Sequence, residues 1–193
     1  MRRLLIAGLL TLGILSGREA LPGTRVTDKP VECTTKFSAP LRALLRKEFP
    51  RLHVPYLAEL DSDAVQDDQR EGGDGCYVVA TGDFTGEGRQ SVAMILAPVN
   101  AMRGQLLVAI KTQSGWRLDK LPTYCGDVRS CYVKVQRPGT YVRTQSVDGP
   151  VQADGELEEM TTKVDAVISG KFESTGVVFA YANGHWNYVW VSD

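Results

Sequence analysis

The sequence has few of the residues that most enzymes use for catalysis. Its 193 residues contain only two histidines, His53 and His185, and neither has an evident serine or cysteine partner. The motifs Gly-x-Ser-x-Gly and His-Glu-x-x-His and the phosphate-binding loop are all absent. We therefore expect no catalytic residues and a role other than catalysis.

The sequence also lacks an excess of charge of either sign. It has 22 lysines and arginines and 23 aspartates and glutamates, which gives a formal net charge of −1. Nucleic-acid-binding domains carry a basic patch or stripe, and proteins held on anionic lipid carry clustered cations. Because neither pattern is present, we expect no nucleic-acid partner and no membrane association beyond a targeting segment.

No apolar run is long enough to cross a bilayer, which takes about 20 residues. The longest, Leu4–Leu15, follows Arg2 and Arg3, an arrangement typical of secretory signal peptides. We predict that residues 1–20 are a signal peptide and that residues 21–193 form one exported, β-rich domain in the periplasm or outside the cell. An uncleaved N-terminal anchor is the alternative.

An even number of cysteines in an exported chain predicts disulfides. The four cysteines, Cys33, Cys76, Cys125 and Cys131, allow three pairings. We favour Cys125–Cys131, which closes a short loop, and Cys33–Cys76, which ties the N-terminal arm to the core. Metal ligation is the alternative, but the sequence has no Cys-x-x-Cys and few histidines.

The stretch from Gly82 to Leu96 is the centre of the predicted fold. An apolar run, Val92–Val99, starts in its second half and continues beyond it. Such a run is typical of a strand buried on both faces. Cys76–Ala80 is predicted to be its partner strand. Three more hairpins are predicted, Leu106–Lys111 with Trp116–Leu121, Tyr132–Gln136 with Tyr141–Ser146, and Val177–Ala182 with His185–Val191, and Lys163–Ser169 is a further strand.

One helix is predicted, over Ser38–Phe49. Ser38 is a suitable N-cap, Pro40 suits the first turn, and Pro50 ends the helix. Leucines share one face, and the basic residues of the opposite face are interpreted as solvated. The predicted fold class is mainly β (α+β), an antiparallel sheet or sandwich of several hairpins with one N-terminal amphipathic helix.

The turn from Gly82 to Gln90 has alternating oxygen-bearing side chains, Asp83, Thr85 and Glu87, followed by Gly88. It resembles the FG-GAP and VCBS-type repeats, in which such a turn precedes an apolar strand. The resemblance implies Ca²⁺ at those three residues, although Thr85 stands where Asn or Asp is usual. A turn held by Asp83 hydrogen bonds is the alternative that we favour, with no cofactor.

Two groups of residues are candidates for contact with a partner. Asp61, Asp63, Asp67 and Asp68 lie in Glu59–Asp74, which is predicted to be an exposed acidic loop that either meets a basic partner or is simply solvated. Trp186, Tyr188 and Trp190 alternate along the last strand and would share one face. That face is either a stacking or hot-spot surface or part of the core, and we favour the core.

These observations lead to two functional hypotheses. The first is a non-catalytic exported binding protein that captures another envelope or secreted protein, for example an immunity or inhibitor protein directed at a cell-envelope enzyme. The second is a calcium-stabilised adhesion or ligand-binding module of the FG-GAP/VCBS type.

Overall fold

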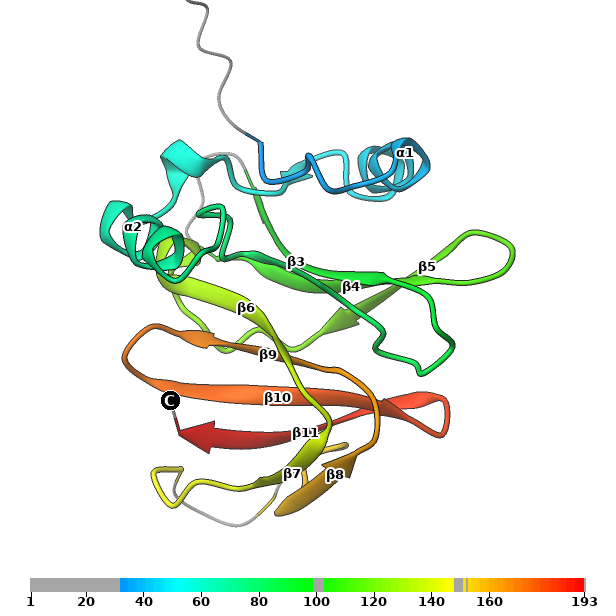
Figure 1. Ribbon diagram of the computed structural model, residues 1–193, viewed down its shortest axis with the longest axis vertical. Coiled ribbons are helices and arrows are strands. Elements are labelled where there is room, and N and C mark those ends of the chain that lie inside the picture. Colours follow the sequence, from blue (N-terminus) through cyan, green and yellow to red (C-terminus); the bar gives the residue numbers. More distant parts are fainter. Residues whose placement is uncertain (1–31, 99–102, 148–150, 152, 193) are drawn as a thin grey trace, which may run out of the picture.

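The computed structural model describes residues 32–98, 103–147, 151 and 153–192 (Figure 1). Within these residues the protein is mainly antiparallel β, with eleven strands and two α-helices. The predicted fold class is therefore confirmed. The predicted signal peptide lies outside the described residues. In the part that the structure describes, no helix has the length and apolar character needed to cross a membrane.

The first sheet has the predicted apolar strand at its centre. Strand β3 (Ser91–Pro98) pairs with β4 (Gln105–Lys111), which pairs with β5 (Trp116–Leu121). Two short strands, β1 (Leu52–His53) and β2 (Val79–Gly82), pair with opposite ends of β3 along its other edge. The predicted partner strand at Cys76–Ala80 thus begins later in the chain, at Val79.

The second sheet has the order β11-β10-β9-β6. Its strands are β6 (Cys131–Gln136), β9 (Ala166–Lys171), β10 (Thr175–Ala182) and β11 (His185–Ser192). The hairpin of β10 and β11 is confirmed. Asn183 and Gly184 have φ angles of 53° and 86°, the positive values that the predicted turn requires at both positions.

The predicted hairpin between Tyr132–Gln136 and Tyr141–Ser146 is wrong. Strand β6 pairs with β9 on one side, and on the other side the Val133 N–H donates to the Tyr77 carbonyl oxygen at 2.7 Å. Because both edges of β6 are occupied, the chain after the Pro-Gly turn cannot pair back onto it. It forms β7 (Gly139–Val142), which pairs with β8 (Glu159–Thr162) in a separate sheet.

The two larger sheets are stacked, α1 lies on the outer side of the first sheet, and α2 lies at the left end of that sheet, near the start of β6 (Figure 1). Strands β3 and β4 are buried along nearly their whole length, which explains why their sequences are continuous apolar runs. The largest fully buried side chains include Tyr77, Phe84, Leu41, Met94 and Phe179. Burying a large apolar side chain stabilises the fold by about 1.5–3 kcal/mol, so these layers hold the scaffold together.

Helix α1 (Ala39–Glu48) is the predicted amphipathic helix. The Leu41 N–H donates to the Ser38 hydroxyl at 3.4 Å, and Leu41 and Leu45 are buried. Phe49 is its C-terminal cap. The helix is thus capped at Ser38 and buried along its leucine face, as the sequence predicts.

The predicted acidic loop is wrong, because helix α2 (Ser62–Arg70) occupies much of Glu59–Asp74. The Asp61 carboxylate accepts hydrogen bonds from the N–H groups of Asp63 and Ala64, at 3.0 and 3.1 Å. This N-cap satisfies donors that would otherwise be free, and the negative charge suits the positive end of the helix dipole. Short 3₁₀ turns span Leu57–Glu59 and Val128–Ser130.

The structure joins Cys33 to Cys76 and Cys125 to Cys131, with Cα–Cα distances of 5.4 and 5.5 Å. This is the pairing that the sequence favours. The first disulfide connects the segment before α1 to the segment before β2, and the second closes the loop that leads into β6. Disulfides persist in oxidising compartments, so the pairing indicates a non-reducing environment.

Candidate functional site

A pocket of about 240 Å³ lies between α1, β1 and β3. One side of it is apolar and is formed by Leu45, Phe49, Leu52, Val54 and Leu96. The rim is polar and contains Glu32, Thr34, Arg42, Arg46, His53 and Tyr56. An apolar wall with a few converging polar groups is the usual composition of a binding site.

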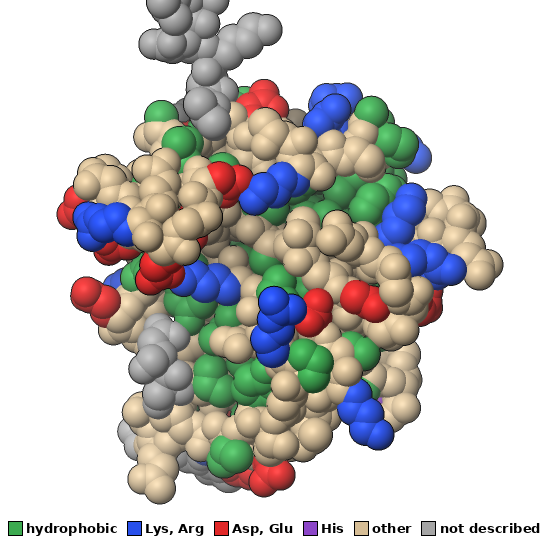
Figure 2. All heavy atoms as spheres, viewed as in Figure 1, with side chains coloured by type: hydrophobic (Ala, Val, Ile, Leu, Met, Phe, Trp, Pro, Cys, Tyr) green, Lys and Arg blue, Asp and Glu red, His purple; other side chains and the backbone are tan. Residues whose placement is uncertain are grey.

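The rim carries the guanidinium groups of Arg42 and Arg46. Arg42 donates through Nη1 to the carbonyl oxygens of Phe37 and Thr34, at 2.8 and 3.5 Å. Neither Arg42 nor Arg46 forms an ion pair with any carboxylate of the described residues. Figure 2 shows basic side chains near α1 beside hydrophobic surface. The rim is therefore suited to an anionic group.

A third cation lies beside the same pocket. The Lys120 Nζ of β5 lies 5.2 Å from the centroid of the Phe49 ring, which forms part of the apolar wall. A cation over an aromatic face is stabilised by the ring quadrupole. Lys120 therefore adds positive potential at the end of α1.

His53 is held at the edge of the pocket by Glu59. Its Nε2 lies 2.8 Å from Glu59 Oε2, and the Tyr56 N–H donates to that same oxygen at 2.8 Å. The ring of Tyr56 lies 5.3 Å from that of His53. The His53 Nδ1 is buried and has no hydrogen-bond partner among the described residues. The described lining contains no serine or cysteine that His53 could activate.

Helix periodicity explains how α1 builds this rim. Arg42 and Arg46 are four residues apart, so they lie one turn apart on the same side of the helix. That side borders the face that buries Leu41 and Leu45. The sequence interpretation of the basic face as merely solvated is therefore incomplete, because the pocket forms only when β1 and β3 pack against α1.

The turn after β2 is held by Asp83. Its two carboxylate oxygens accept hydrogen bonds from the N–H groups of Gly86 and Gly88, at 2.9 and 2.7 Å. Glu87 forms an ion pair with Arg89, and the Thr85 hydroxyl has no hydrogen-bond partner among the described residues. Asp83 thus binds backbone N–H groups, Glu87 binds a guanidinium group, and Thr85 binds neither. No group of three or more His, Cys, Asp or Glu residues suited to a metal occurs in the described part of the chain.

The acidic residues around α2 mostly have cationic or backbone partners. Asp67 pairs with Arg70, and the Asp68 carboxylate accepts from the Gly75 N–H at 2.8 Å. Lys36 pairs with Asp74 at 2.7 Å, and the Lys36 ammonium holds the pKa of Asp74 below its usual value. Figure 2 shows acidic and basic side chains interspersed over α2. This surface is not a continuous negative patch.

The alternating aromatic residues of β11 are Trp186, Tyr188 and Trp190, and the middle one, Tyr188, points into the interior. Tyr188 is buried, and Trp186 and Trp190 are half-buried and pack against the core. The Trp186 Nε1–H donates to Asp119 Oδ2 of β5 at 2.9 Å, and Trp190 lies 4.6 Å from the Tyr124 ring. The Trp186 contact connects β11 to β5 of the first sheet, and the burial of Tyr188 agrees with the core interpretation of these aromatic residues.

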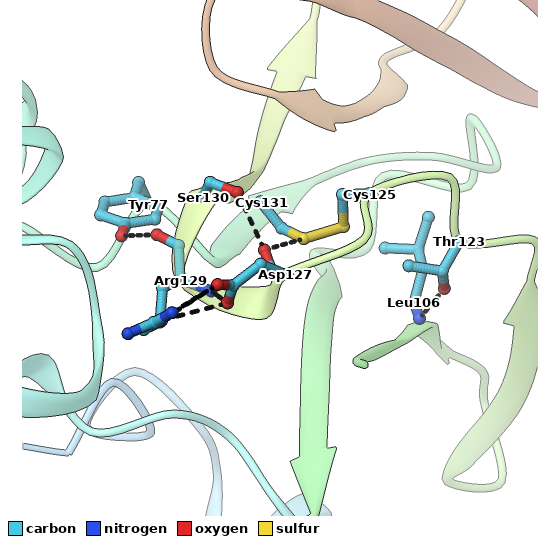
Figure 3. The surroundings of a disulfide bond; sticks show 8 residues. All are labelled: Tyr77, Leu106, Thr123, Cys125, Asp127, Arg129, Ser130 and Cys131. Atoms are coloured by element: carbon cyan, nitrogen blue, oxygen red, sulfur yellow. Dashed lines mark hydrogen bonds and ion pairs between the residues drawn. A yellow bond between two sulfur atoms is a disulfide. The ribbon is translucent and has the colours of Figure 1, made fainter. Parts of the chain in front are cut away.

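The loop closed by Cys125–Cys131 has a fixed hydrogen-bond network (Figure 3). Asp127 pairs with Arg129 at 2.6 Å, and this contact holds the pKa of the Asp127 carboxyl below its usual value. Burial raises the pKa of the neighbouring Tyr77 hydroxyl to about 12. The network stabilises the loop that leads into β6.

Comparison with known proteins gives no relative from which a function could be transferred. No protein-family model matches the sequence, and the chain matches neither a curated protein nor a solved structure. The functional argument therefore rests on the geometry of the described residues.

Proposed function

We propose that this is a non-catalytic, exported binding protein that captures another protein of the cell envelope or the secreted fraction, in the manner of an immunity or inhibitor protein. The observation that carries the proposal is the pocket beneath α1. It combines an apolar wall with the guanidinium groups of Arg42 and Arg46 on a rim formed by α1 and β1, and neither group pairs with a described carboxylate.

The scaffold around the pocket supports this proposal. Cys33 lies just before α1, and its bond to Cys76 restrains the segment that carries Thr34 and the start of the helix. Preorganised binding residues lose less conformational entropy when a partner binds. The predicted signal peptide and the two disulfides support a location in the periplasm or outside the cell.

The size of the pocket favours a protein partner over a large free ligand. Sites for drug-sized molecules span about 300–1,000 Å³, whereas this pocket measures about 240 Å³. An apolar cavity of about 150 Å³ already accommodates benzene. The pocket therefore suits one anchoring side chain, and the surrounding surface of α1 and β1 would supply the rest of an interface.

The test is capture from an envelope extract with the mature protein immobilised. Thr34→Trp places a large ring on the pocket rim, and Thr35→Trp is the matched control because Thr35 is exposed and does not line the pocket. We expect a stoichiometric partner that is retained by the wild type and by Thr35→Trp and lost with Thr34→Trp, with all three proteins equally folded by circular dichroism. No partner, or equal capture by both variants, would contradict the proposal.

A further inference from the structure

We infer that the pocket beneath α1 binds a carboxylate attached to one apolar side chain, and that the partner supplies it as its C-terminal residue. The inference rests on the proposed function, because it names the part of the partner that enters the pocket. It is carried by the two guanidinium groups of the rim and by the apolar side chains that line the same pocket.

The guanidinium groups identify the anionic part of the ligand. Backbone carbonyls fix one nitrogen of Arg42, which leaves its other N–H groups available at the rim. Arg46 lies one helical turn away, also without an ion pair among the described residues. Guanidinium groups bind carboxylates through paired, charge-assisted hydrogen bonds, so a carboxylate suits this pair of arginines.

The rim also contains one described carboxylate, which does not cancel this charge. Glu32 accepts a hydrogen bond from the Thr34 hydroxyl at 2.7 Å. Two guanidinium groups outnumber it, and Lys120 adds positive charge beside Phe49. The second acidic residue nearby, Glu59, lies 2.8 Å from His53 and is already engaged.

The apolar wall identifies the other part of the ligand. Leu45, Leu52 and Leu96 present aliphatic groups, and Phe49 adds a ring. A volume of about 240 Å³ holds a side chain the size of leucine together with a carboxylate, and little more. A peptide C-terminus joins these two groups at one carbon atom, whereas an internal Asp or Glu separates its carboxylate from the neighbouring apolar side chain.

The experiment is a titration of the mature, isotope-labelled protein with the peptide acetyl-Ala-Ala-Leu, followed by the NMR shifts of the α1 and β1 amides. The same peptide with a C-terminal amide tests the carboxylate. Arg46→Gln tests the rim, and Lys47→Gln is its control, because Lys47 lies on the same helix, is 79% exposed and does not line the pocket.

We expect the free-acid peptide to bind at least about tenfold more tightly than the amide, since ionised hydrogen bonds are the strong ones. Arg46→Gln should weaken binding of the acid at least about fivefold, and Lys47→Gln should change it less than about twofold. Added salt should weaken the acid more than the amide.

Several outcomes would overturn the inference. One is equal binding of the two peptides, another is equal loss with both variants, and a third is no shift in α1 or β1. If Arg46→Gln lowered stability without changing binding, Arg46 would serve the fold and the inference would fail. If a partner were captured through the pocket but the peptides did not discriminate, the inference would fail while the proposed function stood. If the peptides discriminated but Arg46→Gln left partner capture unchanged, the assignment to the partner's C-terminus would be wrong.

Discussion

The Tyr77 hydroxyl donates a hydrogen bond to the carbonyl oxygen of Arg129 at 2.6 Å, across 52 positions of sequence (Figure 3). The same oxygen of Tyr77 accepts the Asp61 N–H at 2.9 Å. One buried side chain thus connects the start of α2 to the loop closed by Cys125–Cys131. Two segments that flank the first sheet are held in place by this single group.

Tyr77→Phe should therefore destabilise the fold by about 1–3 kcal/mol, because it leaves the partner groups unsatisfied. The effect should depend on pH. The folded-state pKa of Tyr77, about 12, lies above the ordinary value of 10.0, so its stabilising contribution is complete below pH 10 and is lost as pH rises through 12. Urea unfolding of both proteins should show a cost of substitution that shrinks above pH 10. A cost that is constant with pH would contradict this role.

Removal of the two disulfides should have unequal effects. The bonds join residues separated by 43 and by 6 positions. Loop-closure entropy predicts a loss of about 4 kcal/mol for replacing both Cys33 and Cys76 by alanine, and about 2 kcal/mol for Cys125 and Cys131. Chemical denaturation of the two double variants measures the difference. The wild type should show no reactive thiol after denaturation without reductant, and labelled thiols would contradict the pairing.

The turn held by Asp83 should be independent of calcium. We expect saturating Ca²⁺ to leave the melting temperature unchanged, whereas a site at about 100 times its dissociation constant would add about 2.7 kcal/mol. Asp83→Ala should cost about 1 kcal/mol, because the Gly86 and Gly88 N–H groups lose their acceptor. A calcium-dependent rise in melting temperature that Asp83→Asn abolished would support the calcium module instead.

The aspartates of α2 should differ from one another in their effect on stability. Asp61→Ala should cost about 0.5–2 kcal/mol, because the side chain caps the helix. Asp63→Asn, at an exposed position in the first turn, should change stability by less than about 0.5 kcal/mol. Thermal unfolding of the two single variants tests this. Equal effects would mean that the charge of these residues matters and the cap does not.

The sequence by itself determined the elements whose signals are local. The apolar run at β3, the Asn183-Gly184 turn and the cap at Ser38 each act through neighbours in the chain, so each is found where it is predicted. Of the three cysteine pairings that the sequence allows, the one that it favours is found, because a loop as short as that of Cys125 and Cys131 brings its ends together at low entropic cost.

Only the tertiary structure decided which elements meet. Strand β6 pairs with β9 on one edge and with the Tyr77 carbonyl on the other, and no local pattern in β6 predicts these partners. Helix α2 has too few apolar residues for a recognisable periodicity, and its formation depends on the Asp61 cap and on the packing of Ala64 and Val65. The candidate site also depends on the tertiary structure, because its lining comes from α1, β1 and β3. Arg42 and Arg46 are visible as a basic helical pair in the sequence, but they line a pocket only together with Leu52 and Leu96 of the first sheet.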